Sequence, residues 1–148
     1  MNGTKNPLLE AAYTYLDLGY SILPILPNEK RPLVKWVEFQ SRQASREEAA
    51  EWWTHTPSPN IGIVTGRVSG LTVIDIDGKT GIDSLRVQGV PLPKTRVIQT
   101  PKGWHLYCTY NGLLHTGAAF LPGIDVRNDG GYVVAPPSSI DGKTYRVF

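Results

Sequence analysis

Apolar and polar positions follow two different periods along the chain. Over residues 7–18 the apolar residues fall on one face of a helix, with a proline in its first turn. A second helix is predicted from a capping box at Ser45 and Glu48 to about residue 55. Between these helices, residues 20–25 (YSILPI) indicate a short strand. The first part of the chain therefore predicts the order helix, strand, helix.

From residue 60 onward, polar and apolar positions alternate with the period of two that is typical of strands. Hairpin-length turns separate the apolar runs, and one short helix is predicted over residues 80–89. The predicted strands cover residues 60–66, 71–77, 95–100, 104–110, 123–127 and 131–136. This order indicates an α+β fold, in which helices pack on a mostly antiparallel, mixed sheet.

Length and composition fit a single globular domain over residues 1–148, because 41% of the residues are apolar and only 19% are charged. No apolar run has the length of a membrane helix, and the first residues lack the pattern of a signal peptide. We therefore expect a cytoplasmic protein that does not enter a membrane. The final YRVF has the pattern of an unfinished strand, as in a piece of a longer protein.

The cysteine, histidine and charge content narrows the kinds of site that the chain can form. A single cysteine, Cys108, argues against an internal disulfide framework. The three histidines, at positions 55, 105 and 115, lack the spacing of a structural zinc site. A net charge of +2 is only weakly basic and does not by itself indicate nucleic-acid binding. The basic residues are densest in NEKRPLVK at 28–35, a pattern that a solvated loop also explains.

Two carboxylates, Asp75 and Asp77, interrupt an otherwise apolar strand, TVIDIDG at residues 72–78. Because strand side chains alternate between faces, both carboxylates point one way while Ile74 and Ile76 point the other way. Neighbouring carboxylates repel each other and are costly to bury, and a divalent cation removes both costs. Their hard oxygens suit Mg²⁺ or Mn²⁺. The alternative is a strand end in solvent, with Asp77 as a turn residue.

Two later strands repeat this division into a polar and an apolar face. His105 and Tyr107 share a face in GWHLYC, and Asp125 and Arg127 share a face in GIDVRND. A lone strand histidine is usually structural, and Asp125 could simply pair with Arg127. Three such strands in one small domain nevertheless form a face suited to metal and phosphate, since carboxylates hold cations while His and Arg donate to phosphate oxygens.

Two other phosphate motifs fit the sequence less well. GKT occurs at residues 78–80 and 142–144, but Val73 and Pro137 replace the glycine that a P-loop needs five positions earlier. VIDIDG also looks like the first motif of haloacid-dehalogenase-type phosphatases, whose first Asp is a nucleophile on the first strand of a parallel sheet. Here a long segment precedes that motif, and the strands after it look like hairpins. A non-catalytic nucleic-acid-binding domain is the third alternative.

Five ordered motifs resemble the archaeo-eukaryotic primase superfamily. The likeness is closest to the bifunctional primase-polymerase domain at the N-terminus of plasmid, phage and prophage replication proteins. The motifs are ILPNEKRPLVKW (25–36), NIGIVTG (60–66), VIDIDG (73–78), PKGWHLYC (101–108) and GIDVRNDGGYVVAPPS (123–138). Each motif alone is weak, whereas five in this order across most of the chain are specific.

The resemblance implies a catalytic core related to the RNA-recognition-motif fold, preceded by an N-terminal α/β part. It implies template-directed nucleotidyl transfer, which is DNA primase and DNA polymerase activity, with Asp75, Asp77 and Asp125 as catalytic ligands of two Mg²⁺ or Mn²⁺ ions. The nucleotide-binding residues that it implies are His105, Arg127, Ser138, Lys30 and Lys35.

The resemblance also implies the partners of the domain. These are a single-stranded DNA template, a primer strand and an NTP or dNTP, with a helicase or a helical priming module in the full-length protein. Some relatives carry a zinc-binding insertion, but we expect no zinc here because the sequence has only one cysteine.

Overall fold

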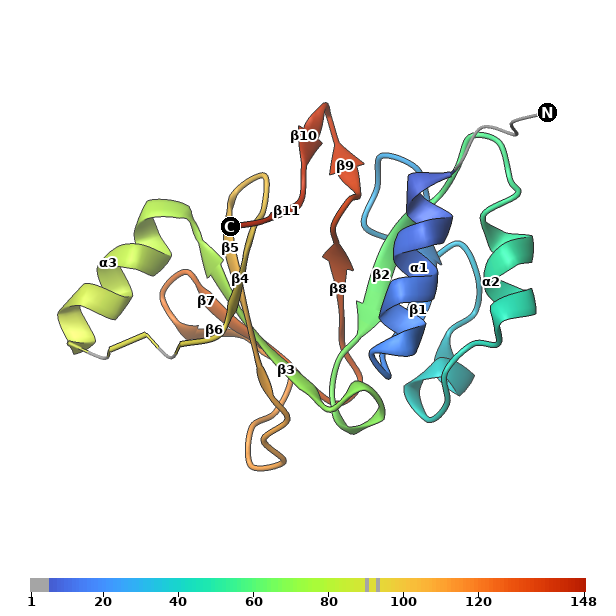
Figure 1. Ribbon diagram of the computed structural model, residues 1–148. Coiled ribbons are helices and arrows are strands. Elements are labelled where there is room, and N and C mark those ends of the chain that lie inside the picture. Colours follow the sequence, from blue (N-terminus) through green and yellow to red (C-terminus); the bar gives the residue numbers. More distant parts are fainter. Residues whose placement is uncertain (1–5, 90, 93) are drawn as a thin grey trace.

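The computed structural model describes residues 6–89, 91–92 and 94–148 (Figure 1). Its helices are α1 (Pro7–Asp17), α2 (Arg46–Trp52) and α3 (Gly78–Gln88), with short 3₁₀ turns η1 (Val37–Gln40) and η2 (Arg67–Ser69). Its strands are β1 (Ser21–Ile25), β2 (Asn60–Val64), β3 (Leu71–Asp77), β4 (Arg96–Gln99), β5 (Gly103–Thr109), β6 (Gly117–Leu121), β7 (Ile124–Arg127), β8 (Tyr132–Ala135), β9 (Ser139–Ile140), β10 (Lys143–Thr144) and β11 (Arg146–Val147).

These strands form two main sheets and one small hairpin. The three-stranded sheet has the order β1-β2-β8, the six-stranded sheet has the order β11-β4-β5-β3-β7-β6, and β9 pairs with β10. Every strand pair in the described residues is antiparallel. The predicted α+β fold is therefore confirmed. None of the helices within these residues is long and apolar enough to cross a membrane.

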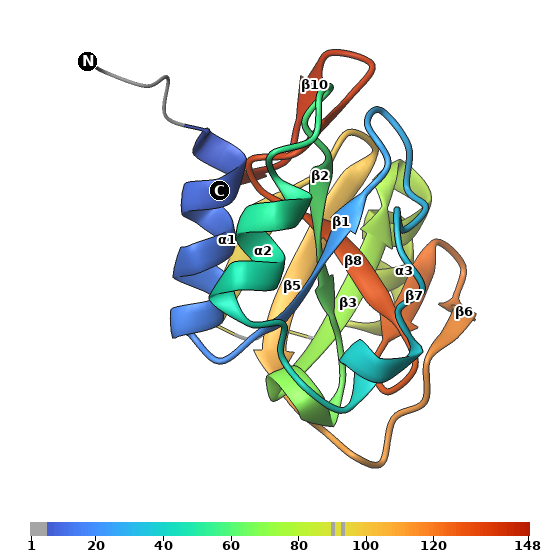
Figure 2. The same ribbon diagram turned by 90° about the vertical axis from the view of Figure 1, so that its right-hand side faces the viewer.

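Helices α1 and α2 lie on the outer face of the three-stranded sheet (Figure 2). Asn6 caps α1 by accepting a hydrogen bond from the Leu8 amide at 3.0 Å. The predicted capping box of α2 is present, because Ser45 and Glu48 bond each other's backbone amides. This helix ends at Trp52, before the predicted residue 55.

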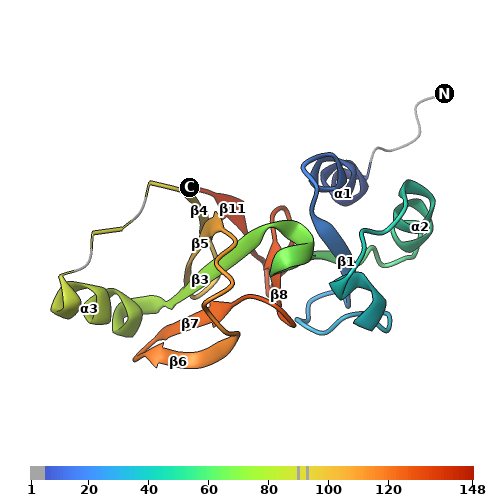
Figure 3. The same cartoon turned by 90° about the horizontal axis from the view of Figure 1, so that it is seen from below.

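Helix α3 lies on the other side of the six-stranded sheet, away from α1 and α2 (Figure 3). It begins at Gly78, directly after β3, and so starts two residues earlier than predicted. Gly89 ends it in the left-handed conformation, as the sequence indicates. The apolar face of β3 packs here, with Ile76 buried against Leu106 and Ile124 of the neighbouring strands. The opposite face of β3 is left to face the three-stranded sheet.

Buried Asn128 ties together two of the segments that connect the two sheets, through its side-chain amide and its backbone carbonyl. Its Oδ1 accepts a 2.9 Å bond from the Thr72 hydroxyl of β3, and its Nδ2 donates to the carbonyls of Asn111 and Leu114. The Thr65 hydroxyl, just after β2, donates to the Asn128 carbonyl at 2.6 Å. Asn128 is 0% exposed, so water cannot reach its polar groups, and these hydrogen bonds within the protein satisfy them. The crossings from β2 to β3 and from β7 to β8 are therefore held side by side.

Asn128→Ala is expected to lower the free energy of unfolding by about 2–4 kcal/mol, because the buried polar groups it leaves would lose their partners. Urea denaturation followed by circular dichroism measures this. The control is Asn111→Ala. Among the described residues its side chain bonds only the exposed Leu113 amide, so its loss should cost about 0.5 kcal/mol or less. Similar losses in the two variants would contradict the role assigned to Asn128.

Candidate active site

Asp75 lies in the middle of the six-stranded sheet, with a chemically capable residue opposite it on each neighbouring strand. It faces His105 in the β3–β5 pair and Asp125 in the β3–β7 pair. Residues directly opposite in an antiparallel pair point to the same face, as the alternation in the sequence predicts. The Nε2 atom of His105 lies 3.5 Å from Oδ1 of Asp75. The sheet thus places two carboxylates and one imidazole in a row.

A cleft between the two sheets opens over this row. It consists of two adjoining hollows of about 300 and 420 Å³. The residues that line both hollows are Lys30, Asp75, His105, Arg127 and Tyr145. The smaller hollow extends along Tyr132, Val133 and Val134 of β8, so each sheet supplies one wall.

The third predicted metal ligand, Asp77, lies at the exposed end of β3 and lines only the larger hollow, together with Asp125. Within residues 6–89, 91–92 and 94–148, no three His, Cys, Asp or Glu side chains converge closely enough to hold a metal ion. The Asp125 carboxylate lies 3.4 Å from the Arg127 guanidinium of the same strand. The predicted three-Asp centre is therefore not assembled as a compact cluster.

The donor chemistry of the cleft nevertheless fits a hard divalent cation. Asp75 and Asp125 are directly opposite each other, and their side chains are 28% and 31% exposed, so both can be reached from the cleft. Hard carboxylate oxygens at such a position are the ligands that Mg²⁺ and Mn²⁺ prefer. Asp77, one pleat further along β3, offers a third carboxylate at the mouth of the cleft.

Burial shifts the pKa of two residues of the row, Asp75 and His105. It raises the pKa of Asp75, and the negative charges of Asp125 and Asp77 act in the same direction, while Arg127 and Lys30 oppose them. Burial also lowers the pKa of His105 to about 4, with the positive charges of Lys30 and Arg127 acting in the same direction. The imidazole is therefore neutral at neutral pH, and its contact with Asp75 is not an ion pair.

The structure separates the predicted phosphate-binding residues into two groups. Lys30 and Arg127 line the cleft, as His105 does. Lys35 is exposed and lies outside the cleft lining. Ser138 is 0% exposed, and its hydroxyl accepts a 2.9 Å bond from the Ile61 amide. Because the fold already uses that hydroxyl, we no longer include Ser138 among the candidate phosphate ligands.

Several cleft residues were not among those predicted from the sequence. They are Tyr132, Tyr145, Lys102 and Lys143. Lys102 lies in the turn just before the strand of His105, and this nearness in the sequence could have indicated that it lines the same site. Lys143 and Tyr145 lie in or beside strands of two residues, which are too short to show a period.

Residues 12–148 match the family Prim-Pol, described as bifunctional DNA primase/polymerase, N-terminal. The matched range contains all of the residues that line the cleft. No curated protein matches the sequence.

Asp75→Asn is expected to raise the free energy of unfolding by about 0.5–1 kcal/mol, because it removes repulsion between directly opposed carboxylates. Urea denaturation at pH 7 with a chelator present measures this. Asp77→Asn, at the exposed strand end, is the control and should change stability by less than half as much. A loss of stability in Asp75→Asn would contradict this description of the row.

Proposed function

Because the chain belongs to the Prim-Pol family of bifunctional DNA primase/polymerase N-terminal domains, we propose that its cleft carries out template-directed nucleotidyl transfer. In this reaction a primer 3′-oxygen bonds to the α-phosphorus of an NTP or dNTP while the bond to pyrophosphate breaks. The observation that best supports the proposal is the row of His105, Asp75 and Asp125 across three strands, with Lys30 and Arg127 in the same cleft.

The carboxylates form the metal-binding side of the proposed site. Asp75 and Asp125 would hold Mg²⁺ or Mn²⁺, with Asp77 as the third ligand from the end of β3. When bound, such ions supply Lewis-acid activation and neutralise charge on the triphosphate. Asp75 is suited to this role because its carboxylate is already partly withdrawn from water and lies next to a like charge. A bound cation would relieve both of these costs.

The basic residues form the phosphate-binding side of the proposed site. Arg127 stands beside Asp125 on β7, and Lys30 comes from the loop after β1, so cations approach the carboxylates from both sheets. A guanidinium can donate two parallel hydrogen bonds to a phosphate, while the ammonium of Lys30 acts as a point charge. Neutral His105 adds one N–H donor without adding a positive charge. The triphosphate would therefore lie between Lys30, Arg127 and the Asp75 row.

A haloacid-dehalogenase-type phosphatase is not supported by the fold. In those enzymes the VIDIDG-like motif lies on a strand of a parallel sheet, whereas β3 is antiparallel to both β5 and β7. A non-catalytic nucleic-acid-binding domain is distinguished by experiment. Such a domain would bind single-stranded DNA and show no nucleotide incorporation.

The decisive experiment is extension of a labelled primer on a single-stranded template with dNTPs or NTPs and Mg²⁺ or Mn²⁺. We expect extension by the wild-type chain, and a loss of about 100-fold or more in Asp75→Asn and in Asp125→Asn. Glu47→Gln, in the exposed first turn of α2, is the charge-matched control and should extend at the wild-type rate. Absence of extension by a folded, DNA-binding wild-type chain would sink the proposal, and release of phosphate from a simple phosphomonoester would favour hydrolysis.

Two lysines of one loop allow a matched test of nucleotide binding. Lys30→Ala should weaken binding of a nucleoside triphosphate by about 3- to 10-fold, because a cation of the cleft is lost. Lys35→Ala, outside the cleft lining, should change it by less than about 2-fold. Isothermal titration calorimetry measures both, and equal losses would show that the loop acts only through its total charge. Weaker single-stranded DNA binding in Lys35→Ala alone would assign Lys35 to the template.

A further inference from the structure

Tyr145 lies where the chain passes from one sheet to the other. The segment leaves the three-stranded sheet at the end of β8, forms the β9–β10 hairpin, and joins the six-stranded sheet as β11 beside β4 (Figure 1). The Tyr145 amide donates to the Ser138 carbonyl at 2.8 Å, and Arg146 pairs with Gln99 in the next position. The backbone on both sides of Tyr145 is therefore fixed, and its side chain stands at the cleft between the sheets.

Tyr145 is buried as a residue, and its hydroxyl makes no hydrogen bond to another residue in the described part of the chain. The residue is 3% exposed and lines both hollows of the cleft. Its ring centre lies 6.2 Å from that of His105, with the two rings inclined at 45°. Burial, with the charge of Asp75 as a further cause, raises the pKa of Tyr145 to about 12, so the phenol keeps its proton at neutral pH. A protonated, unpartnered hydroxyl thus lies beside the row of proposed catalytic residues.

The chemistry of this hydroxyl matches a sugar better than a phosphate. The cleft already offers Lys30 and Arg127 as cationic phosphate donors, whereas a neutral phenol both donates and accepts, as a sugar hydroxyl does. In a nucleotide the sugar is joined to the α-phosphate through a single oxygen. The ring of Tyr145 is next to that of His105. If His105 contacts the phosphates, Tyr145 is therefore placed to contact the sugar.

We propose that Tyr145 is the sugar-reading residue of the cleft, with its hydroxyl bonded to a ribose or deoxyribose hydroxyl of the bound nucleotide. This inference rests on the proposed nucleotidyl-transfer function. It assigns specificity to a residue at the crossing between the sheets, outside the strands that carry the carboxylates and the histidine.

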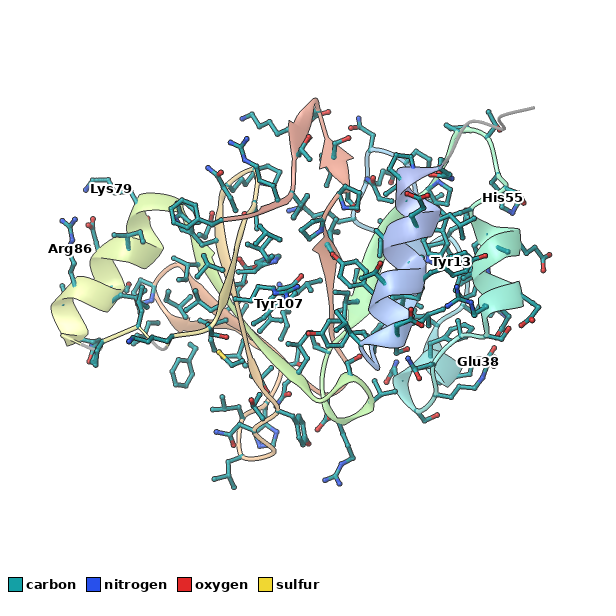
Figure 4. The ribbon with its side chains drawn as sticks, in the orientation of Figure 1. Tyr13, Glu38, His55, Lys79, Arg86 and Tyr107 are labelled. Atoms are coloured by element: carbon teal, nitrogen blue, oxygen red, sulfur yellow. The ribbon has the colours of Figure 1, made fainter. Side chains whose placement is uncertain are left out.

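Tyr107 provides a matched control for this proposal. It is also a buried tyrosine, 5% exposed, and its hydroxyl likewise has no partner among the described residues. It lies between the six-stranded sheet and β8 (Figure 4) but does not line either hollow. Tyr107→Phe and Tyr145→Phe therefore remove the same atom from two buried sites, of which only one faces the cleft. Each variant keeps its ring, and melting temperatures check that the fold is kept.

The test is calorimetric titration of wild type and both variants with ATP, dATP, 2′,3′-dideoxy-ATP and tripolyphosphate, each with Mg²⁺. Tyr145→Phe should weaken ATP binding by about 3- to 10-fold, the effect of losing one neutral hydrogen bond, and leave dideoxy-ATP and tripolyphosphate unchanged. If dATP follows ATP, the 3′-hydroxyl is the partner, and if it follows dideoxy-ATP, the 2′-hydroxyl is the partner. Tyr107→Phe should change none of the four affinities.

Two results would overturn the proposal. Equal weakening of ATP, dideoxy-ATP and tripolyphosphate by Tyr145→Phe would make Tyr145 a phosphate contact, and unchanged binding of all four would leave it a packing role. Failure of the wild-type chain to bind any of the nucleotides is a different result, because it would reject the nucleotidyl-transfer function itself.

Discussion

The geometry of the cleft depends on the hydrogen bonds that buried Asn128 forms. Asn128 lies in the crossing from β7 to β8, and it joins both ends of the crossing from β2 to β3. Its backbone carbonyl accepts a hydrogen bond from the Thr65 hydroxyl, and its side-chain Oδ1 accepts one from the Thr72 hydroxyl. Gly66 brings the segments close, since a Cβ there would lie 2.4 Å from the carboxylate of Asp129, and its φ of +95° favours glycine. With the crossings locked, the polar face of β3 is held toward β8, and the cleft has a wall from each sheet.

The parts of the fold that could be predicted from the sequence are those specified by local chemistry. The capping box at Ser45 and Glu48 was correct because both partners lie within one helical turn. The shared face of Asp75, His105 and Asp125 was foreseen strand by strand, because side-chain alternation needs no knowledge of the partner strand. What alternation could not give is the register, which places these three residues directly opposite one another.

The parts that escaped prediction depend on contacts between distant segments. Ser138 was a candidate phosphate contact only because the family resemblance implies it, and the sequence does not show that the Ile61 amide bonds its hydroxyl in the fold. The strands β10 and β11 have only two residues each and show no period, so the position of Tyr145 at the cleft could not be predicted from the sequence. The contact between Asp125 and Arg127, by contrast, was one of the alternatives that the strand pattern raised.

The cleft places two carboxylates directly opposite each other, and the basic groups Lys30 and Arg127 offset their repulsion and burial only in part. This is the physical reason to regard it as a site for a charged ligand. Asp75 is partly desolvated beside a second carboxylate, and the neutral imidazole of His105 cannot compensate its charge. Lys30 and Arg127 also lie in the cleft, so the carboxylates and the basic groups keep their charges separate apart from the contact between Arg127 and Asp125. A triphosphate with its divalent cations carries both signs of charge, so it can pair with both sets at once. A fold held rigid by Asn128 can maintain this unfavourable arrangement, because relieving it by moving one sheet would break buried hydrogen bonds.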